Sequence, residues 1–295
     1  MSDEKKNLPK GKFLLYYVPS KWPSTTRFRN FNYNEYSINY QTSSLLRSIE
    51  SRFEKIDLLW NHFNEIRKIQ PKENDVAERE GYVNPIYSKL MTAIFEAILN
   101  EFYSINDNVA KILMNIFPKK NLPERMSKLI ARVETYALPG TLTRVIMAYN
   151  TYKSLNAIRT ESSHFSSGFI VPGDAICYFS DKSGPTTKSN GNAILIDDVE
   201  KFYTNQLTET SSFVDKIFAY LESSLTNNNR SIRICGVYGN LLYQRLESYM
   251  DWKTGREGVC TPIWKENTKA DECPLAMSCK AYKNYLIENK IDQVS

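Results

Sequence analysis

The sequence predicts a mainly α-helical protein with a small β-structured part in its second half. Apolar residues recur at helical spacing over most of the first 160 residues, prolines stand where these patterns stop, and short β-prone runs follow Gly168. With 295 residues, 42% of them hydrophobic and 13% aromatic, the chain is long enough to bury a substantial core. We therefore expect a globular fold built on a helical bundle.

The first two helices are predicted by long apolar stripes. Residues 1–40 form a polar, aromatic-rich leader, which we expect to pack on the core. A stripe then runs from residue 43 to residue 70, where a proline ends it. The next helix starts at Asn84-Pro85, an N-cap followed by a proline at the first helical position, and keeps its period to Pro118. This second stripe is the strongest helical pattern in the chain.

Two more helices complete the predicted bundle. One begins at Pro123-Glu124 and stops before Pro139-Gly140. Thr141 can cap the other, whose apolar stripe ends at Ile158. Together these helices predict a four-helix up-and-down bundle over residues 41–167.

Beyond Gly168 the composition changes. The runs Phe169–Val171, Ala175–Phe179 and Ala193–Ile196 are short, β-prone and separated by polar loops, which predicts a small hairpin or sheet. A helix follows, capped by Asp197 or Asp198 and ending near Leu225. We expect residues 168–295 to form an α+β appendage with additional C-terminal helices and a cysteine-containing tail.

The opening segment and the cysteines bear on location and cofactors. The first 12 residues are charged and polar, and the apolar run Phe13–Val18 is too short for a signal-peptide core or a membrane span. The chain holds five cysteines, an odd number without a CxxC pair. We therefore predict a soluble, cytoplasmic protein with reduced thiols and no membrane partner.

Four of these cysteines are Cys235, Cys260, Cys273 and Cys279, in the last quarter of the chain. Four thiols can bind zinc, but their spacing lacks the close pairs of zinc knuckles and ribbons, which favours free cysteines. Phosphate-loop, dinucleotide-binding, H-E-x-x-H and G-x-S-x-G motifs are all absent from the sequence. We therefore predict neither a bound metal nor another cofactor.

Positive charge is concentrated between Lys111 and Arg159. This segment holds nine Lys or Arg residues against two acids and carries a net charge of +7, whereas the whole chain carries +5. A phosphate backbone would favour such a segment, although solvated helix faces give the same pattern. The candidate RNA-binding residues are Lys128, Arg132, Arg144 and Lys153.

The segment Arg159-Thr-Glu-Ser-Ser-His164 contains one of the two histidines of the chain. Histidine titrates nearest to neutral pH and can carry a proton, while arginine offers a charged fork to phosphate oxygens. At about 100° per helical residue these side chains lie roughly 140° apart, so two copies across a twofold axis would make a better site than one. Chance places an Arg and a His at this spacing in many helices.

The sequence SLNAIRTESSHFSSGFI resembles the R-x4-6-H signature that closes the last core helix of the HEPN superfamily, and the four predicted helices resemble its bundle. The resemblance covers less than half of the chain. It implies a metal-independent endoribonuclease that acts as a homodimer and leaves a 2',3'-cyclic phosphate. It also implies a role in toxin, defence or stress responses, with an antitoxin or other regulatory protein as a partner.

The resemblance assigns roles to individual residues. Arg159 would hold the scissile phosphate, and His164 would move protons. Thr160, Glu161, Ser162 and Ser163 would support them. Many active members carry Asn, Asp or His after the arginine, where this chain has Thr160. The alternative is therefore a catalytically inactive scaffold that binds RNA, a nucleotide or a partner protein through the same surface.

Overall fold

The chain forms two compact units in the computed structural model. Ile38–Tyr220 make up one, the helical unit, and Met1–Ser37 with Leu221–Ser295 make up the other, the sheet unit. The structure describes residues 13–15, 23–31, 38–81, 84–164, 169–171, 175–178, 194–196, 198–225, 230–238, 241–262 and 273–290. This division differs from the expected boundaries at residues 40 and 167, because most of the long helix that follows residue 167, α8 (Val199–Ser223), belongs to the helical unit. The mainly helical fold with a small three-stranded antiparallel sheet is as predicted.

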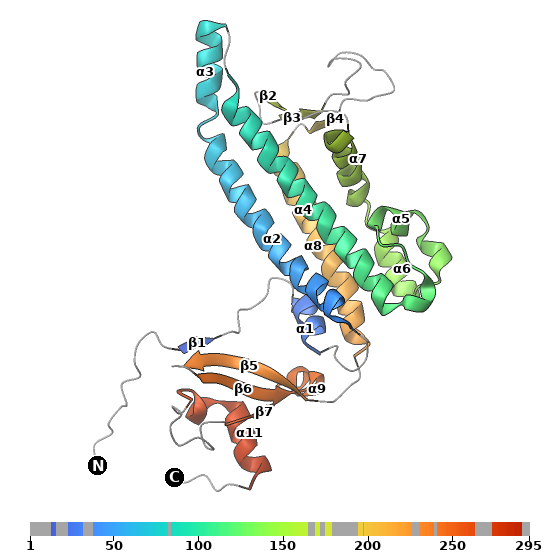
Figure 1. The fold of residues 1–295 in the computed structure, drawn as a ribbon, viewed down its shortest axis with the longest axis vertical. Helices are drawn as coiled ribbons and strands as arrows, with labels where there is room; N and C mark the ends of the chain where they lie inside the picture. Colours follow the sequence, from blue (N-terminus) through green and yellow to red (C-terminus); the bar gives the residue numbers. More distant parts are fainter. Residues whose placement is uncertain are drawn as a thin grey trace, which may run out of the picture. The chain divides into compact units, whose positions relative to one another are not determined.

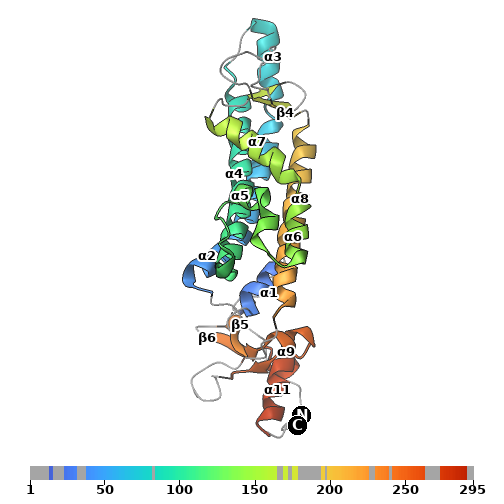
Figure 2. The same cartoon turned by 90° about the vertical axis from the view of Figure 1, so that its right-hand side faces the viewer.

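Three long helices dominate the helical unit: α2 (Tyr40–Arg67), α4 (Ile86–Ile116) and α8 (Val199–Ser223), with the short α3 (Pro71–Glu80) after α2 (Figures 1 and 2). The side chain of Asn39 caps α2 by accepting a hydrogen bond of 2.8 Å from the backbone N–H of Thr42. The stripes that predicted α2 and α4 are buried against each other. Their fully buried side chains include Leu46, Ile49, Phe53, Phe95 and Ile98.

Aromatic contacts join α8 to the other helices of this unit. The rings of Trp60 in α2 and Tyr203 in α8 stack with their centroids 3.8 Å apart. Phe202 packs on Phe95 of α4 at 5.9 Å. The prediction that assigned this helix to an appendage beyond residue 168 is thus corrected by its packing in the bundle.

The helix expected over residues 123–138 is shorter and irregular. It consists of α5 (Met126–Ala131) and the 3-10 helix η2 (Val133–Tyr136), preceded by the 3-10 helix η1 (Pro118–Lys120). Ala137 ends η2 in the left-handed region, with φ of +47°.

The helix expected after Thr141 is divided into α6 (Gly140–Met147) and α7 (Thr151–His164). The break falls where the buried ring of Tyr149 stacks on Phe213 of α8, with centroids 4.2 Å apart. The Tyr149 hydroxyl lies 2.9 Å from Oγ1 of Thr210, also in α8. This tertiary contact accounts for a break that the apolar period does not show.

A three-stranded antiparallel sheet follows α7 and confirms the predicted β-prone runs. It consists of β2 (Phe169–Val171), β3 (Ala175–Tyr178) and β4 (Ile194–Ile196), in that order. Ile176 pairs with Ile170 on one side and with Ile196 on the other.

The sheet unit contains a second antiparallel sheet in the order β1-β5-β6-β7, which the sequence analysis did not predict. Its strands are β1 (Phe13–Leu15), β5 (Ser231–Tyr238), β6 (Leu241–Glu247) and β7 (Val259–Cys260). The helices in its described part are α1 (Pro23–Phe31), α9 (Tyr249–Lys253), the 3-10 helix η3 (Ala276–Ser278) and α11 (Lys280–Glu288).

The N-terminal part of the chain is tied to the C-terminal part within this unit. Phe13 pairs with Tyr238 in the sheet. Arg27 of α1 forms a bidentate ion pair with Glu222, at 2.6 and 2.9 Å, and its guanidinium carbon lies 4.8 Å from the ring centroid of Trp252. The described residues include no helix long and apolar enough to cross a membrane.

Candidate nucleic-acid interface

Helix α7 presents its apolar stripe to α4 and thereby positions Arg159. The side chains of Tyr152, Leu155 and Ile158 are buried. Arg159 follows at the edge of this stripe, and its guanidinium carbon lies 4.0 Å from the ring centroid of Tyr103 in α4. A cation over an aromatic face contributes about 0.5–2 kcal/mol. The candidate phosphate-binding arginine is thus held against a ring of the neighbouring helix.

Asp107 lies one turn beyond Tyr103 on α4. Its Oδ1 accepts a hydrogen bond of 2.9 Å from the backbone N–H of Met126, at the start of α5. Burial raises the pKa of the Asp107 carboxyl, against the opposing effects of this hydrogen bond and of the positive charges of Lys111, Arg159 and Arg125. Asp107 therefore links α4 to α5 and places Arg125 and Arg159 near the same carboxyl group.

Buried tyrosines pack next to the contact between Arg159 and Tyr103. The rings of Tyr103 and Tyr152 lie 5.9 Å apart. Burial raises the pKa of the Tyr152 phenol, and the adjacent Tyr103 raises it further. Burial also raises the pKa of Tyr149 to about 12. The phenols of Tyr149 and Tyr152 are therefore neutral at physiological pH and act as packing groups.

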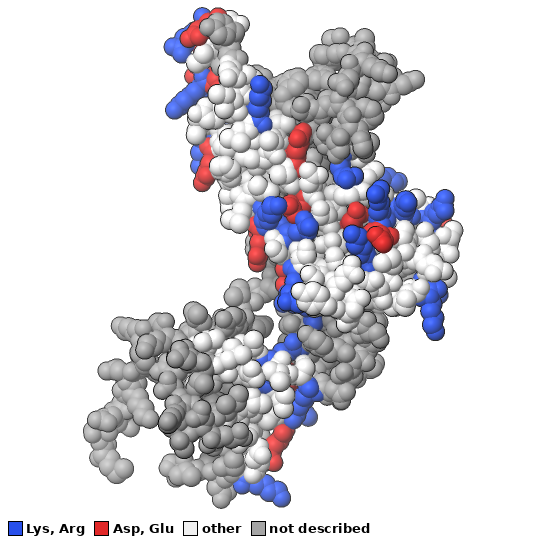
Figure 3. Space-filling view, viewed as in Figure 1, with Lys and Arg blue, Asp and Glu red and all other residues white. Residues whose placement is uncertain are grey.

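Basic side chains are exposed on the segment that runs from the 3-10 helix η1 to the first turn of α7. We define the basic face by seven exposed residues: Lys119, Lys120, Arg125, Lys128, Arg132, Arg144 and Lys153. Figure 3 shows Lys and Arg gathered in the region of α5 and α6. Among the residues that the structure describes, none of the seven forms an ion pair with a carboxylate. Arg125 acts on the carboxyl group of Asp107, whereas the charges of the other six are directed to the solvent in the described part of the chain.

The structure describes the side chains of some, but not all, of the site residues expected from the sequence. Lys128, Arg132, Arg144 and Lys153 lie on the basic face. Arg159 is partly exposed. It lies at the border of this face, since its charge and that of Arg125 both act on the carboxyl group of Asp107. The five residues from Thr160 to His164 lie in α7, but their side chains fall outside the described part of the chain.

Sequence reasoning missed Tyr103 and Asp107. They stand four residues apart on α4 and so share a helix face, which was read only for its apolar period. A tyrosine and a carboxylate at this spacing, at the edge of the apolar stripe, are the signal that would have found them.

No family model matches this chain, and comparisons with curated proteins and with solved structures likewise gave no match. Any functional conclusion therefore rests on the chain's own residues.

Proposed function

We propose that the protein binds RNA through the basic face. The observation that carries this proposal is the set of seven exposed cations, from Lys119 to Lys153, none of which forms an ion pair with a carboxylate among the described residues. Phosphate groups are the natural counterions of such a surface, and binding releases the small cations condensed on the nucleic acid. The R-x4-H segment next to this face favours RNA over DNA, because its chemistry uses a 2'-hydroxyl.

Ribonuclease activity of the HEPN type is the second candidate. Arg159 borders the basic face and is held by Tyr103, so a phosphate bound there would lie close to α7. In this proposal two protomers pair so that His164 of one or both activates the 2'-hydroxyl and protonates the leaving 5'-oxygen, giving a 2',3'-cyclic phosphate. The enzyme would act in the cytoplasm in a defence or stress response, with an antitoxin or other regulatory protein as its partner.

A binding assay tests the first candidate. Fluorescence anisotropy with a labelled single-stranded RNA should show saturable binding by the wild-type protein and a loss of more than tenfold in affinity for Lys128→Glu/Arg132→Glu. The matched control is Lys72→Glu/Lys89→Glu, which reverses two exposed charges outside the basic face. Equal affinity of the two double variants would overturn the basic face as the binding surface, and single-stranded DNA of the same sequence tests the choice of RNA.

A cleavage assay separates the enzyme from the scaffold. Total RNA is incubated with the protein in EDTA, and the new ends are sequenced. Cleavage by the wild type that His164→Ala and Arg159→Ala both abolish supports the ribonuclease, provided that both variants keep the wild-type circular dichroism spectrum. Binding without cleavage leaves the inactive RNA-binding scaffold. A strictly monomeric protein in light scattering would count against the composite site.

A further inference from the structure

Tyr40, the first residue of α2, is 83% exposed. Other tyrosines of the helical unit, such as Tyr103, Tyr149 and Tyr152, are buried. Within the described part of the chain, the Tyr40 side chain makes no hydrogen bond and no ring contact. A single exposed aromatic residue is common on protein surfaces, so its neighbours decide what it can bind.

Hydrogen bonds fix the backbone of Tyr40 beside the end of α4. The side chain of Asn39 accepts hydrogen bonds from the backbone N–H of Thr42 at 2.8 Å and from its hydroxyl at 2.9 Å. Asn115, in the last turn of α4, donates a hydrogen bond of 2.7 Å to the same hydroxyl oxygen. Four residues further along the chain, in η1, stands Lys119, the first residue of the basic face. The first turn of α2 is therefore held next to the segment that leads into the basic face.

The two stretches that meet here contain no acidic residue. We call them the α2–α4 corner: residues 38–49 at the start of α2 and residues 108–123 at the end of α4. The corner holds four Lys or Arg residues, of which Arg47, Lys119 and Lys120 are exposed. None of these three forms an ion pair with a carboxylate among the described residues. Their charge therefore attracts phosphate groups to this corner.

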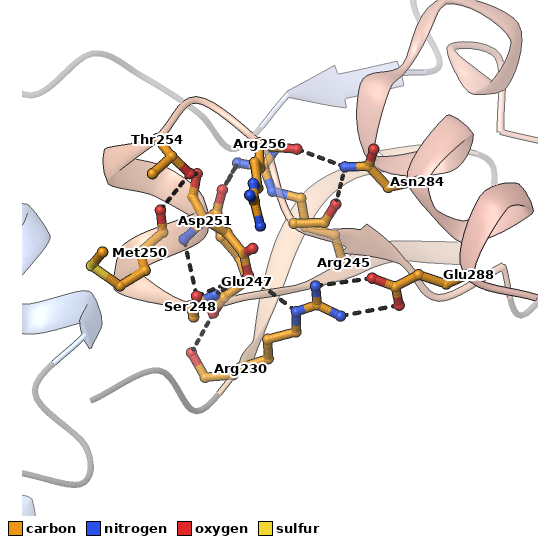
Figure 4. A network of polar contacts seen from close by, with 12 residues as sticks. Arg230, Arg245, Glu247, Ser248, Met250, Asp251, Thr254, Arg256, Asn284 and Glu288 are labelled. Atoms are coloured by element: carbon orange, nitrogen blue, oxygen red, sulfur yellow. Dashed lines mark hydrogen bonds and ion pairs between the residues drawn. The ribbon is translucent and has the colours of Figure 1, made fainter. Parts of the chain in front are cut away.

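Arg230 of the sheet unit shows the contrasting arrangement. Its two terminal nitrogens bind Glu288 at 3.0 and 3.1 Å, and its Nε lies 3.1 Å from Asp251 (Figure 4). Two carboxylates compensate this guanidinium, so it attracts a further anion only weakly. Arg47 forms no such pair in the described part of the chain.

Tyr40 and Arg47 share one face of α2. They stand seven residues apart, which is two helical turns and about 10 Å along the axis. Ser44, also exposed, lies between them on the same face. Proteins that bind single-stranded nucleic acids combine such parts, because bases stack on aromatic rings while cations bind the phosphates. A duplex keeps its bases stacked inside and offers no free base to a tyrosine.

We propose that the RNA bound by the basic face is single-stranded at the α2–α4 corner, where an unpaired base stacks on Tyr40 and Arg47 binds a neighbouring phosphate. This inference rests on the proposed RNA binding and narrows its ligand to RNA with unpaired bases. Every base has an aromatic face, so the stacking selects for unpaired nucleotides and not for a particular sequence.

Fluorescence anisotropy with a labelled single-stranded RNA tests the contribution of the ring. Tyr40→Ala and Tyr40→Leu should weaken binding about tenfold, whereas Tyr40→Phe, which keeps the aromatic face, should stay within about twofold of wild type. Tyr87→Ala is the matched control and should keep the wild-type affinity. Tyr87 is 36% exposed and lies in the first turn of α4, at the opposite end of this helix from Asn115.

Two further measurements separate stacking from a general effect on the surface. The slope of log K against log salt concentration should be unchanged in Tyr40→Ala, because the ring neutralises no phosphate, and should fall by about 0.7 in Arg47→Ala. A fully paired RNA duplex of the same sequence should bind wild type and Tyr40→Ala with equal affinity.

The outcomes distinguish this inference from the proposed function. Absence of RNA binding by the wild-type protein would overturn both. If Lys128→Glu/Arg132→Glu weakens binding but Tyr40→Ala and Tyr40→Leu do not, the basic face stands and the stacking on Tyr40 is overturned. Equal losses in Tyr40→Phe and Tyr40→Ala, or equal losses for the strand and the duplex in Tyr40→Ala, would overturn the stacking as well.

Discussion

The guanidinium carbon of Arg159 lies 4.0 Å from the ring centroid of Tyr103, so the arginine expected from the sequence to bind phosphate rests on an aromatic face of α4. The ring restricts the positions that the guanidinium can take while leaving it partly exposed. An arginine ordered in this way loses less conformational entropy when it binds a phosphate than one that extends freely into solvent.

The first prediction concerns the coupling between these two side chains. In a double-mutant cycle of Arg159→Ala and Tyr103→Leu, urea unfolding should give a coupling free energy of about 0.5–2 kcal/mol. Tyr103→Phe keeps the ring and should retain most of this coupling. A coupling near zero would show that the contact contributes nothing to stability.

The second prediction concerns the salt dependence of RNA binding. Each cation of the basic face that contacts a phosphate adds about 0.7 to the slope of log K against log salt concentration on a single strand. Lys128→Ala/Arg132→Ala should therefore lower the slope by about 1.4. Lys72→Ala/Lys89→Ala should leave it unchanged, and the same slope in both double variants would contradict the assignment.

Glu101 of α4 gives the third prediction. Its buried carboxylate pairs with Arg52 and Lys55 of α2 and so joins the two longest stripes of the bundle. Glu101→Gln should lower the free energy of unfolding by about 1–3 kcal/mol, since it weakens two charge-assisted hydrogen bonds at a buried position. Glu65→Gln, which removes the charge of an exposed carboxylate 3.5 Å from His62, should change it by less than about 0.5 kcal/mol.

The fourth prediction concerns pH. Burial raises the pKa of Asp107 above its ordinary value of 3.8, so the folded protein holds this proton more tightly than the unfolded chain does. The stability that Asp107 contributes is thus full below the unfolded pKa and is lost as pH rises through the folded pKa. Asp107→Asn removes this loss of stability, because an amide does not ionise. Its side-chain oxygen can still accept the hydrogen bond from the backbone N–H of Met126.

Urea unfolding of wild type and Asp107→Asn between pH 4 and pH 7 measures this effect. The stability of the variant relative to wild type should rise with pH across that window. Asp107→Ala, which cannot accept the hydrogen bond, should be less stable than Asp107→Asn by about 1 kcal/mol. A relative stability that falls as pH rises would show that the charges of Arg125, Arg159 and Lys111 outweigh burial.

The fifth prediction compares two glycines of one turn region. Gly255 and Gly258 both have positive φ, +70° and +69°, but only Gly258 has a neighbour that an added Cβ would meet. Gly255→Ala should cost about 1 kcal/mol for the left-handed conformation alone. Gly258→Ala should cost at least about 2 kcal/mol more, because the backbone of β6 must move. Similar melting temperatures of the two variants would contradict this approach of the turn to Leu246.

Much of the helical unit follows from the sequence because its long helices carry strong local signals. The apolar stripes and the prolines near their ends place α2 and α4 to within a few residues. The predicted cap by Asn84 is wrong, because Pro85 is the N-cap residue of α4 and makes no side-chain capping bond. The break at Tyr149 has no such signal, because it depends on Phe213 and Thr210 of a helix much later in the chain. Arg159 was found from its own segment, whereas Tyr103 and Asp107 reach it only through the packing of α7 on α4.

The sequence carries a local signal for the second sheet, although the strands were not predicted from it. The run from Ser231 to Tyr238 is β-prone, and Gly239-Asn240 stands between it and the next strand, a spacing typical of a two-residue hairpin. The packing of Cys235, Cys260, Cys273 and Cys279 around one core could not be derived even so, because it requires the order of the strands and the position of α11. Local patterns do not determine either of them.

The pairing of Phe13 with Tyr238 sets the order in which the two units can be completed during synthesis. Strand β1 is made first, but its partner β5 leaves the ribosome only after the whole of Ile38–Tyr220 has been translated. The helical unit can therefore fold while β1 still lacks its partner. The sheet unit is therefore completed last. Strand β1 can pair with β5 only if it stays accessible while the helical unit folds.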